Sequence, residues 1–167
     1  MSAIVVRPAT PADAAGMARV HVQAWQETYR GQAPDEVLDA SDFVERRERM
    51  WNRTLDDADR GTRAAVAEID GEIVGIALAG PAQDTDSPHD WQLYVLYLLT
   101  AHHGSGAGQQ LLDEVLTERA SVLWVADPNP RAQAFYARNG FAADGAAQGE
   151  APREIRMVRA ARSRALR

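Results

Sequence analysis

The alternation of hydrophobic and polar positions along the chain predicts seven short β-strands. Two alternating stretches flank Asp70-Gly71, the dipeptide that most strongly indicates a tight hairpin turn. Residues 91–99 and 121–126 are almost continuously apolar, which is typical of strands buried on both faces of a sheet. The predicted strands cover residues 3–7, the hairpin 63–81, and residues 91–99, 121–126, 141–145 and 154–160.

Four intervening segments carry the 3.6-residue spacing of amphipathic helices. In the segment 10–25, Thr10 is the expected N-cap and Pro11 the first helical position. Residues 35–55 form a second helical region with an expected break near residues 39–41. In the third segment, residues 109–120, the apolar residues share one face; they are Leu111, Leu112, Val115 and Leu116.

The fourth helical segment, residues 127–141, begins and ends with residues that favour helix termini. Asn129 is the expected N-cap and Pro130 follows at the first position, whereas Gly140 has the place of a C′ glycine. Strands that alternate with helices in this way predict a mixed α/β sheet with both faces covered. No internal repeat or linker divides the 167 residues, a length that suits one domain.

Composition narrows the possible functions. The chain has no cysteine, which excludes disulfides, thiolate metal sites and a cysteine nucleophile. All 18 basic residues are arginine, and the net charge of -6 argues against nucleic-acid binding, apart from a basic tail at 161–167 that we expect to be solvated. No apolar run could span a bilayer, and the N-terminus lacks the features of a signal peptide. We therefore expect a cytoplasmic protein without membrane or nucleic-acid partners.

A glycine-rich segment, "HHGSGAG" at residues 102–108, lies between the apolar strand 91–99 and the next helix. The free N–H groups at a helix N-terminus and the helix dipole favour an anion, and Gly104, Gly106 and Gly108 would let a phosphate approach the backbone. Purely structural glycines are the alternative. A P-loop is excluded because the chain has no lysine. The spacing G-x-G-x-G fits a dinucleotide site poorly.

The two histidines before these glycines raise the question of a metal site. Adjacent side chains rarely point the same way, and no third ligand has a recognisable spacing, so we expect no metal. The other two histidines, His21 and His89, are expected at the surface or partly buried.

A second motif, "NPRAQAFYARNGF" at residues 129–141, favours an acyl-coenzyme A site over the dinucleotide site. Asn129 and Tyr136 are seven residues apart, which places them on one helix face. Together with the loop 102–108, this helix makes the chain resemble the GNAT superfamily of acyl-CoA-dependent N-acyltransferases. The resemblance also includes "AWQETYRG", "QLYVLYLL" and "EIRMVR", and so covers nearly the whole chain, with an acetyltransferase domain at residues 1–160.

The resemblance implies a twisted sheet of about seven strands with about four helices, splayed between strands 91–99 and 121–125. Pantetheine would lie in the splay, against the backbone of Leu98 and Leu99, and would be bonded by Asn129. The pyrophosphate would be wrapped by the loop residues His103, Gly104, Ser105, Gly106 and Gly108. Tyr136 matches the general acid that protonates the leaving thiolate; a core tyrosine is the alternative.

The resemblance also implies an acceptor site, and here the chain departs from its relatives. Trp25 and Tyr29 match the region that lines the acceptor pocket, although they could equally be helix packing. Gln92 stands where many relatives have glutamate, so the usual base is absent; Gln92 is either a pocket hydrogen-bonder or a satisfied buried amide. Glu27 or Asp90 could then act through water, or the acceptor could arrive partly deprotonated. His103 replaces the usual glutamine or arginine.

The expected function is transfer of an acetyl group from acetyl-CoA, the cosubstrate, to a primary amine of a small molecule. The acidic chain and the aromatic Trp25 and Tyr29 favour a cationic acceptor. Two alternatives remain open at this point: an acyl-CoA-binding module without turnover, and a dinucleotide-binding protein. The oligomeric state expected is a monomer or a homodimer.

Overall fold

The computed structural model describes residues 2–57, 61–150 and 152–162. Seven strands were predicted, and seven are present: β1 Val5–Pro8, β2 Arg63–Ile69, β3 Glu72–Pro81, β4 Trp91–Leu98, β5 Ser121–Ala126, β6 Ala142–Gln148 and β7 Glu154–Arg159. The helices are α1 Ala14–Tyr29, α2 Asp35–Leu38, α3 Phe43–Asp56, α4 Ala107–Leu116 and α5 Pro130–Arg138, with 3₁₀ turns at Pro11–Asp13 and Thr100–His102. The break expected near residues 39–41 separates α2 from α3.

The strands form one mixed sheet in the order β1-β2-β3-β4-β5-β7-β6. All neighbours pair antiparallel except β4 and β5, which are parallel. These two strands pair only at Gln92 with Val122 and at Leu93 with Leu123. Beyond Leu93 they diverge, and the sheet opens in its middle. The predicted splay is therefore confirmed.

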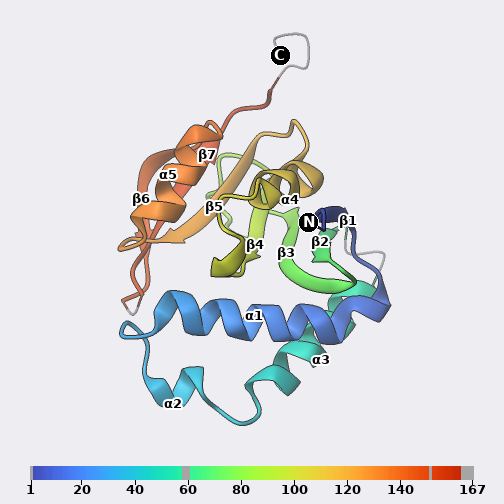
Figure 1. Ribbon diagram of the computed structural model, residues 1–167. Helices are drawn as coiled ribbons and strands as arrows, with labels where there is room; N and C mark the ends of the chain where they lie inside the picture. Colours follow the sequence, from blue (N-terminus) through green and yellow to red (C-terminus); the bar gives the residue numbers. More distant parts are fainter. Residues whose placement is uncertain (1, 58–60, 151, 163–167) are drawn as a thin grey trace.

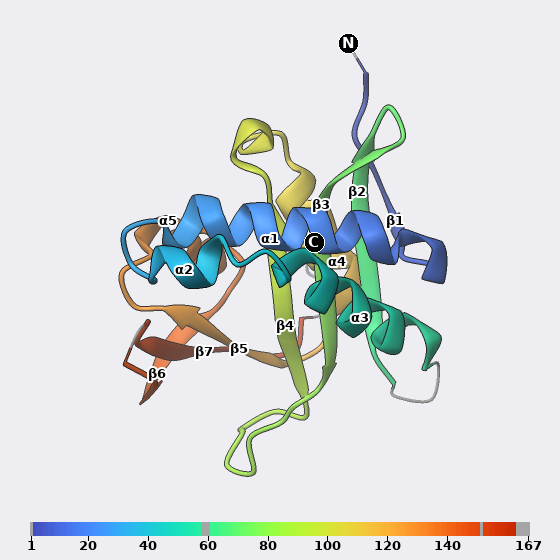
Figure 2. The ribbon, with the colours of Figure 1, turned by 90° about the horizontal axis from the view of Figure 1, so that it is seen from below.

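The helices cover both faces of the sheet (Figures 1 and 2). Helices α1 and α3 lie on one face, where Met17, Val20 and Trp51 pack against Ile76 of β3 in a buried cluster. Helices α4 and α5 share the core of the opposite face, where the predicted apolar face of α4, including Leu111 and Leu112, is fully buried. The two layers meet the open part of the sheet from opposite sides.

Strand β4 contains a bulge that decides which side chains share a face. Val95 pairs with Leu78 and Leu93 with Ala79, so Tyr94 is an extra residue in β4. Because of this extra residue, Gln92, Val95 and Tyr97 all face α1 and α3. Burial on both faces was expected along β4; its first three residues are buried, but the rest are only half-buried because β5 has diverged.

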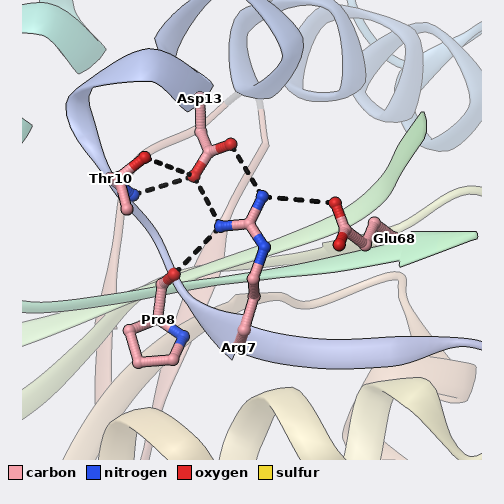
Figure 3. A network of polar contacts seen from close by, with 5 residues as sticks. All are labelled: Arg7, Pro8, Thr10, Asp13 and Glu68. Carbon is pink, nitrogen blue, oxygen red and sulfur yellow. Dashed lines mark hydrogen bonds and ion pairs between the residues drawn. The ribbon is translucent and has the colours of Figure 1, made fainter. Parts of the chain in front are cut away.

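Helix α1 is held to the sheet by an ionic network at its N-terminus (Figure 3). Asp13 accepts two hydrogen bonds from the Arg7 guanidinium, at 2.8 and 2.9 Å, and one from the Thr10 amide at 2.8 Å. Arg7 also donates to Glu68 on β2 at 3.2 Å. The Arg7 hydrogen bonds lower the pKa of the Asp13 carboxyl. Thr10 thus precedes a 3₁₀ turn, and α1 begins at Ala14 rather than at the predicted position.

The helix ends of α4 and α5 follow the sequence closely. Helix α4 begins at Ala107, two residues earlier than predicted. Asn129 caps α5 by accepting from the Ala132 amide at 3.2 Å, and Gly140 follows its end with a φ of 88°. Within the described ranges no helix is long and apolar enough to cross a membrane. Most of the predicted basic tail, residues 163–167, lies outside the described residues.

Candidate active site

The opening between β4 and β5 exposes strand backbone in the middle of the sheet. In an antiparallel pair, successive residues point their N–H and C=O groups alternately toward and away from the partner strand. The amide of Leu99 donates to Val74 of β3 at 3.0 Å. The backbone groups of Leu96 and Leu98 therefore point toward β5, which has moved away. An extended molecule could pair with them there.

The predicted backbone contacts of Leu98 and Leu99 differ in geometry. Leu99 is engaged within the protein, because its carbonyl also accepts from His102 at 2.9 Å. The carbonyl oxygen of Leu98 lies 2.9 Å from Nε2 of His103, so the His103 side chain reaches back to the strand. The Leu98 amide remains as the group that faces the opening.

The glycine loop forms an open cradle at the N-terminus of α4. Gly104 and Gly106 have φ angles of 83° and 89°, which an L side chain rarely adopts, and a Cβ at either position would meet no atom within 4 Å. Ser105 accepts the Ala107 amide on its Oγ at 3.3 Å. The helix supplies no carbonyl for the amides of Gly108 and Gln109. These N–H groups fit an anion.

Tyr136 of α5 belongs to the core that α4 and α5 share, and it is near enough to Tyr29 of α1 to be influenced by its charge. Its ring packs edge-on against Phe135 and Phe141, and the residue is buried. Burial, with a smaller effect of Tyr29, raises the pKa of the Tyr136 hydroxyl above its ordinary value. Within the part of the chain that the structure describes, this hydroxyl has no hydrogen-bond partner. The ring of Tyr136 thus packs in the core, whereas its hydroxyl is free to donate a proton.

Trp25 and Tyr29 lie at the α1 side of the opening, together with Tyr97 of β4. The Trp25 and Tyr29 rings are 4.7 Å apart. Burial first, and then the neighbouring Tyr29, raise the pKa of Tyr97. The indole N–H of Trp25 is buried and lies near Tyr97, where it opposes part of that rise but lacks the geometry of a hydrogen bond. Tyr29, Tyr97 and Tyr136 are close enough for their phenols to influence one another's pKa, and we call them the tyrosine cluster.

Gln92 lines a separate part of the same sheet face. Its side-chain oxygen accepts the Gln83 amide at 3.0 Å, and the residue is buried. Gln92 and Tyr97 are five positions apart along β4, which corresponds to a distance of about 16 Å. Trp25 and Tyr29 therefore do not meet Gln92, although all three were expected around one acceptor.

Gln92 opens instead onto a cavity of about 520 Å³ between α3, β4, β5 and β7. Its walls include the aromatic side chains of Tyr94 and Trp124 and two carboxylates, Asp84 and Glu154. Asp84 accepts the Trp124 indole N–H at 2.7 Å, and Glu154 accepts the Gln148 amide at 3.1 Å. Burial first, and then the charge of Glu154, raise the pKa of Tyr29, so this carboxylate of the cavity influences a residue of the tyrosine cluster.

Sequence reasoning missed Tyr97, Glu154, Asp84 and Trp124. Strict alternation along residues 91–99 predicts that Tyr97 and Gln92 lie on opposite faces of the sheet. The bulge at Tyr94 places both on the same face. Glu154 reaches the cavity through the pairing of β7 with β5, a contact distant in sequence. In the sequence, Glu154 is recognisable only as a carboxylate at the start of a predicted strand.

The histidines serve other purposes. His21 was expected at or near the surface but is buried, and its Nδ1 accepts the Trp51 indole N–H at 3.2 Å. Burial and the nearby Arg47 lower the pKa of His21 to about 3. Among the described residues, no group of three or more His, Cys, Asp or Glu side chains could hold a metal ion.

Comparison with known proteins identifies the fold and the family. The description "Acetyltransferase (GNAT) family" belongs to the family model that matches residues 19–141. The chain is 31% identical over 133 residues to the uncharacterized N-acetyltransferase YuaI of Bacillus subtilis, covering 76% of this chain and 74% of that protein. It is 28% identical to the probable N-acetyltransferase Rv2775 of Mycobacterium tuberculosis, over 86% and 83% of the two chains.

A solved structure has the same arrangement of elements. The PaiA N-acetyltransferase of Thermoplasma acidophilum, in complex with coenzyme A, superimposes with a TM-score of 0.77. The match covers 95% of this chain and 99% of that one at 18% sequence identity. At this identity the likeness establishes the fold.

Proposed function

The chain belongs to the acetyltransferase (GNAT) family and is an acetyl-CoA-dependent acetyltransferase, and from this premise we propose that its acceptor is a primary amine of a small molecule. The observation that carries the proposal is the opening in the sheet. Near it are a backbone cradle at the start of α4, the buried Tyr136 of α5, and an acidic cavity lined by residues of β4, β5 and β7. The family match decides against the dinucleotide-binding alternative.

The residues present fit acetyl-CoA as a substrate. Gly104, Ser105, Gly106 and Gly108 would hold the pyrophosphate through free amides and the dipole of α4, and His103 would border it. The Leu98 amide would pair with the pantetheine arm in the opening, since the backbone of Leu99 is engaged. The Asn129 side chain, whose oxygen caps α5, would offer its amide nitrogen to the same arm.

Transfer begins when the uncharged amine attacks the thioester carbonyl carbon. The carbon–nitrogen bond forms, the carbon–sulfur bond breaks, and sulfur keeps the electron pair. Tyr136 then protonates the thiolate. A thiol has an ordinary pKa of about 8.5 and a phenol one of about 10, so the transfer is uphill in water. Burial raises the pKa of the Tyr136 hydroxyl, and desolvation of the thiolate raises the pKa of the thiol in the same direction.

The acceptor would enter from the α1 and α3 side. Trp25 packs against Tyr29 of the tyrosine cluster at one end of this approach, and Gln92 lines the cavity at the other. Asp84 and Glu154 are the charged side chains among the described residues that line the cavity. Two carboxylates without a matching cation favour an acceptor that carries positive charge.

An amine panel tests the proposal. We expect thiol release from acetyl-CoA with small primary amines, greatest for those with a second positive charge, and no response to NAD. Binding of acetyl-CoA without thiol release for any small amine would overturn the choice of acceptor. A peptide with a free N-terminus serves as the comparison substrate. We further propose that residues 1–160 act as one cytoplasmic domain, as a monomer or a homodimer, which sedimentation of the purified chain would check.

A further inference from the structure

The chain has glutamine at the position where many relatives place their base, so another group must take the proton from the acceptor ammonium. At neutral pH an alkylammonium, with a pKa of about 10.4, is almost entirely protonated. Gln92 cannot accept a proton, and its oxygen already accepts the Gln83 amide. The replacement must be a carboxylate or imidazole that reaches both the cavity and the opening.

The two carboxylates suggested by sequence are engaged elsewhere. Glu27 accepts both the amide and the hydroxyl of Thr100, at 3.0 and 3.1 Å, and so fastens α1 to the loop after β4. The Asp90 side chain is 91% exposed and forms an ion pair with Arg119 at 3.5 Å. Neither lines the cavity that contains Gln92.

Glu154 has the placement that those residues lack. It pairs with Ala126 of β5, three residues and about 10 Å along the strand beyond the last β4–β5 pair, and so lies beside the end of β5 that has diverged from β4. It lines the cavity together with Gln92, and its charge is felt by Tyr29 of the tyrosine cluster. Asp84, the other carboxylate of the cavity, is bound to Trp124 at 2.7 Å.

We propose that Glu154 is the general base of the reaction and takes the proton of the acceptor ammonium at the mouth of the opening. This inference rests on the proposed function. One proton passes from the ammonium to the Glu154 carboxylate, and the free amine attacks the thioester. Tyr136 protonates the sulfur and regains a proton from the new amide nitrogen, and Glu154 releases its proton to water. Atoms and charges then balance.

The groups that face Glu154 come from four elements. Tyr29 belongs to α1, Asp84 to the loop before β4, and Tyr94 to β4; Gln148 of β6 is its hydrogen-bond donor. Arg156, two residues along β7, is held by Asp86 and Asp144 at 3.2 and 2.7 Å and so does not neutralise Glu154.

The test is a pH–rate series with acetyl-CoA and one amine that the wild type accepts. For Glu154→Gln we expect kcat to fall by about 10²-fold or more near pH 7, with acetyl-CoA affinity unchanged. The deficit should shrink to less than about tenfold near pH 10, where much of the amine is already free. Glu154→Asp should keep the wild-type pH profile at a lower kcat.

Asp84→Asn is the matched control, because it removes the other carboxylate of the same cavity. We expect it to raise the acceptor KM and to keep the pH profile. An unchanged kcat in Glu154→Gln, or an equal deficit at every pH in a variant with native circular dichroism, would overturn the assignment of Glu154. If the wild type acetylates no amine, the proposed function itself fails; that result is distinct from an active wild type with an equally active Glu154→Gln.

Discussion

At the scale of single residues, we propose that acetyl transfer depends on Tyr136. This residue of α5 is buried, and no described residue binds its hydroxyl. We expect Tyr136→Phe to lower kcat by about 10²-fold or more, because the leaving thiolate loses its proton donor. Since the ring and its contacts with Phe135 and Phe141 remain, acetyl-CoA affinity and the melting temperature should hardly change.

Steady-state kinetics and calorimetry on Tyr136→Phe measure these quantities. Tyr94→Phe is the comparison variant: it removes a phenol that donates to the Pro81 carbonyl and lines the acceptor cavity, and so shows whether loss of any phenol near the acceptor lowers kcat. If kcat is the same in Tyr136→Phe and in the wild type, Tyr136 is a packing residue only.

Gln92 can be replaced by a carboxylic acid without loss of its local hydrogen bond. In Gln92→Glu, a carboxylate oxygen can still accept the Gln83 amide. The new carboxyl is buried and faces Asp84 and Glu154 across the cavity, and both effects raise its pKa. We therefore expect Gln92→Glu to keep or increase kcat for primary amines and to move the acidic limb of the pH–rate profile.

The same pH series on the wild type and Gln92→Glu measures this. If Gln92 binds the acceptor through its amide N–H groups instead, the substitution removes two donors. A large rise in the acceptor KM with no gain in kcat would then show that Gln92 is a substrate ligand.

At the scale of elements, the sequence predicted well the turns and helix caps that depend on residues close to one another in the chain. The Asp70-Gly71 turn, with φ angles of 52° and 81°, and the Asn129 cap depend on neighbours in sequence. The bulge at Tyr94 depends on how β3 and β4 fit together, and it reverses the faces of the residues beyond it. The cavity beside Gln92 needs α3, β5 and β7 at once, so no window of sequence predicts it.

The loop before α4 is the element that the acetyl-CoA proposal depends on most. We expect Gly106→Glu to abolish acetyl-CoA binding, because its side chain would enter the open cradle and its charge would repel the pyrophosphate. The positive φ of Gly106 adds strain of its own. Gly145→Glu is the matched control: Gly145 has a φ of 93° with open space around it, but lies in β6.

Calorimetric titration with acetyl-CoA measures both variants. We expect Gly145→Glu to bind like the wild type, although strain lowers its stability by about 1 kcal/mol. Equal affinities of Gly106→Glu and the wild type would reduce the loop to a structural connector between β4 and α4.

At the scale of the whole molecule, the opening in the sheet needs support from the layers on either side. Strands β4 and β5 share only two paired positions, so the two halves of the sheet are joined mainly by packing. On the α1 side, His21 joins the helices to the sheet, because it lies between Trp51 of α3 and Tyr97 of β4 with ring centroids 5.9 and 5.3 Å away. The protonation of His21 therefore bears on the stability of the fold.

His21 makes stability depend on pH in a definite direction. Its pKa is about 3 in the folded protein and about 6.5 in the unfolded chain. Between these values the unfolded chain binds more protons, so the free energy of unfolding rises with pH, by about 1.4 kcal/mol per pH unit at most. Asp13, whose pKa is also lowered, loses its contribution only below about pH 4. A window from pH 4.5 to 6 therefore isolates the histidine.

We expect His21→Gln to flatten this slope while keeping an acceptor for the Trp51 indole. His21→Leu should flatten it equally but cost a further 1–3 kcal/mol, roughly, because the buried indole N–H then has no partner. Urea unfolding of the three proteins at several pH values gives the slopes. If the wild type and His21→Gln have parallel curves over pH 4.5 to 6, then His21 is protonated in the fold and the two layers are held together by other residues.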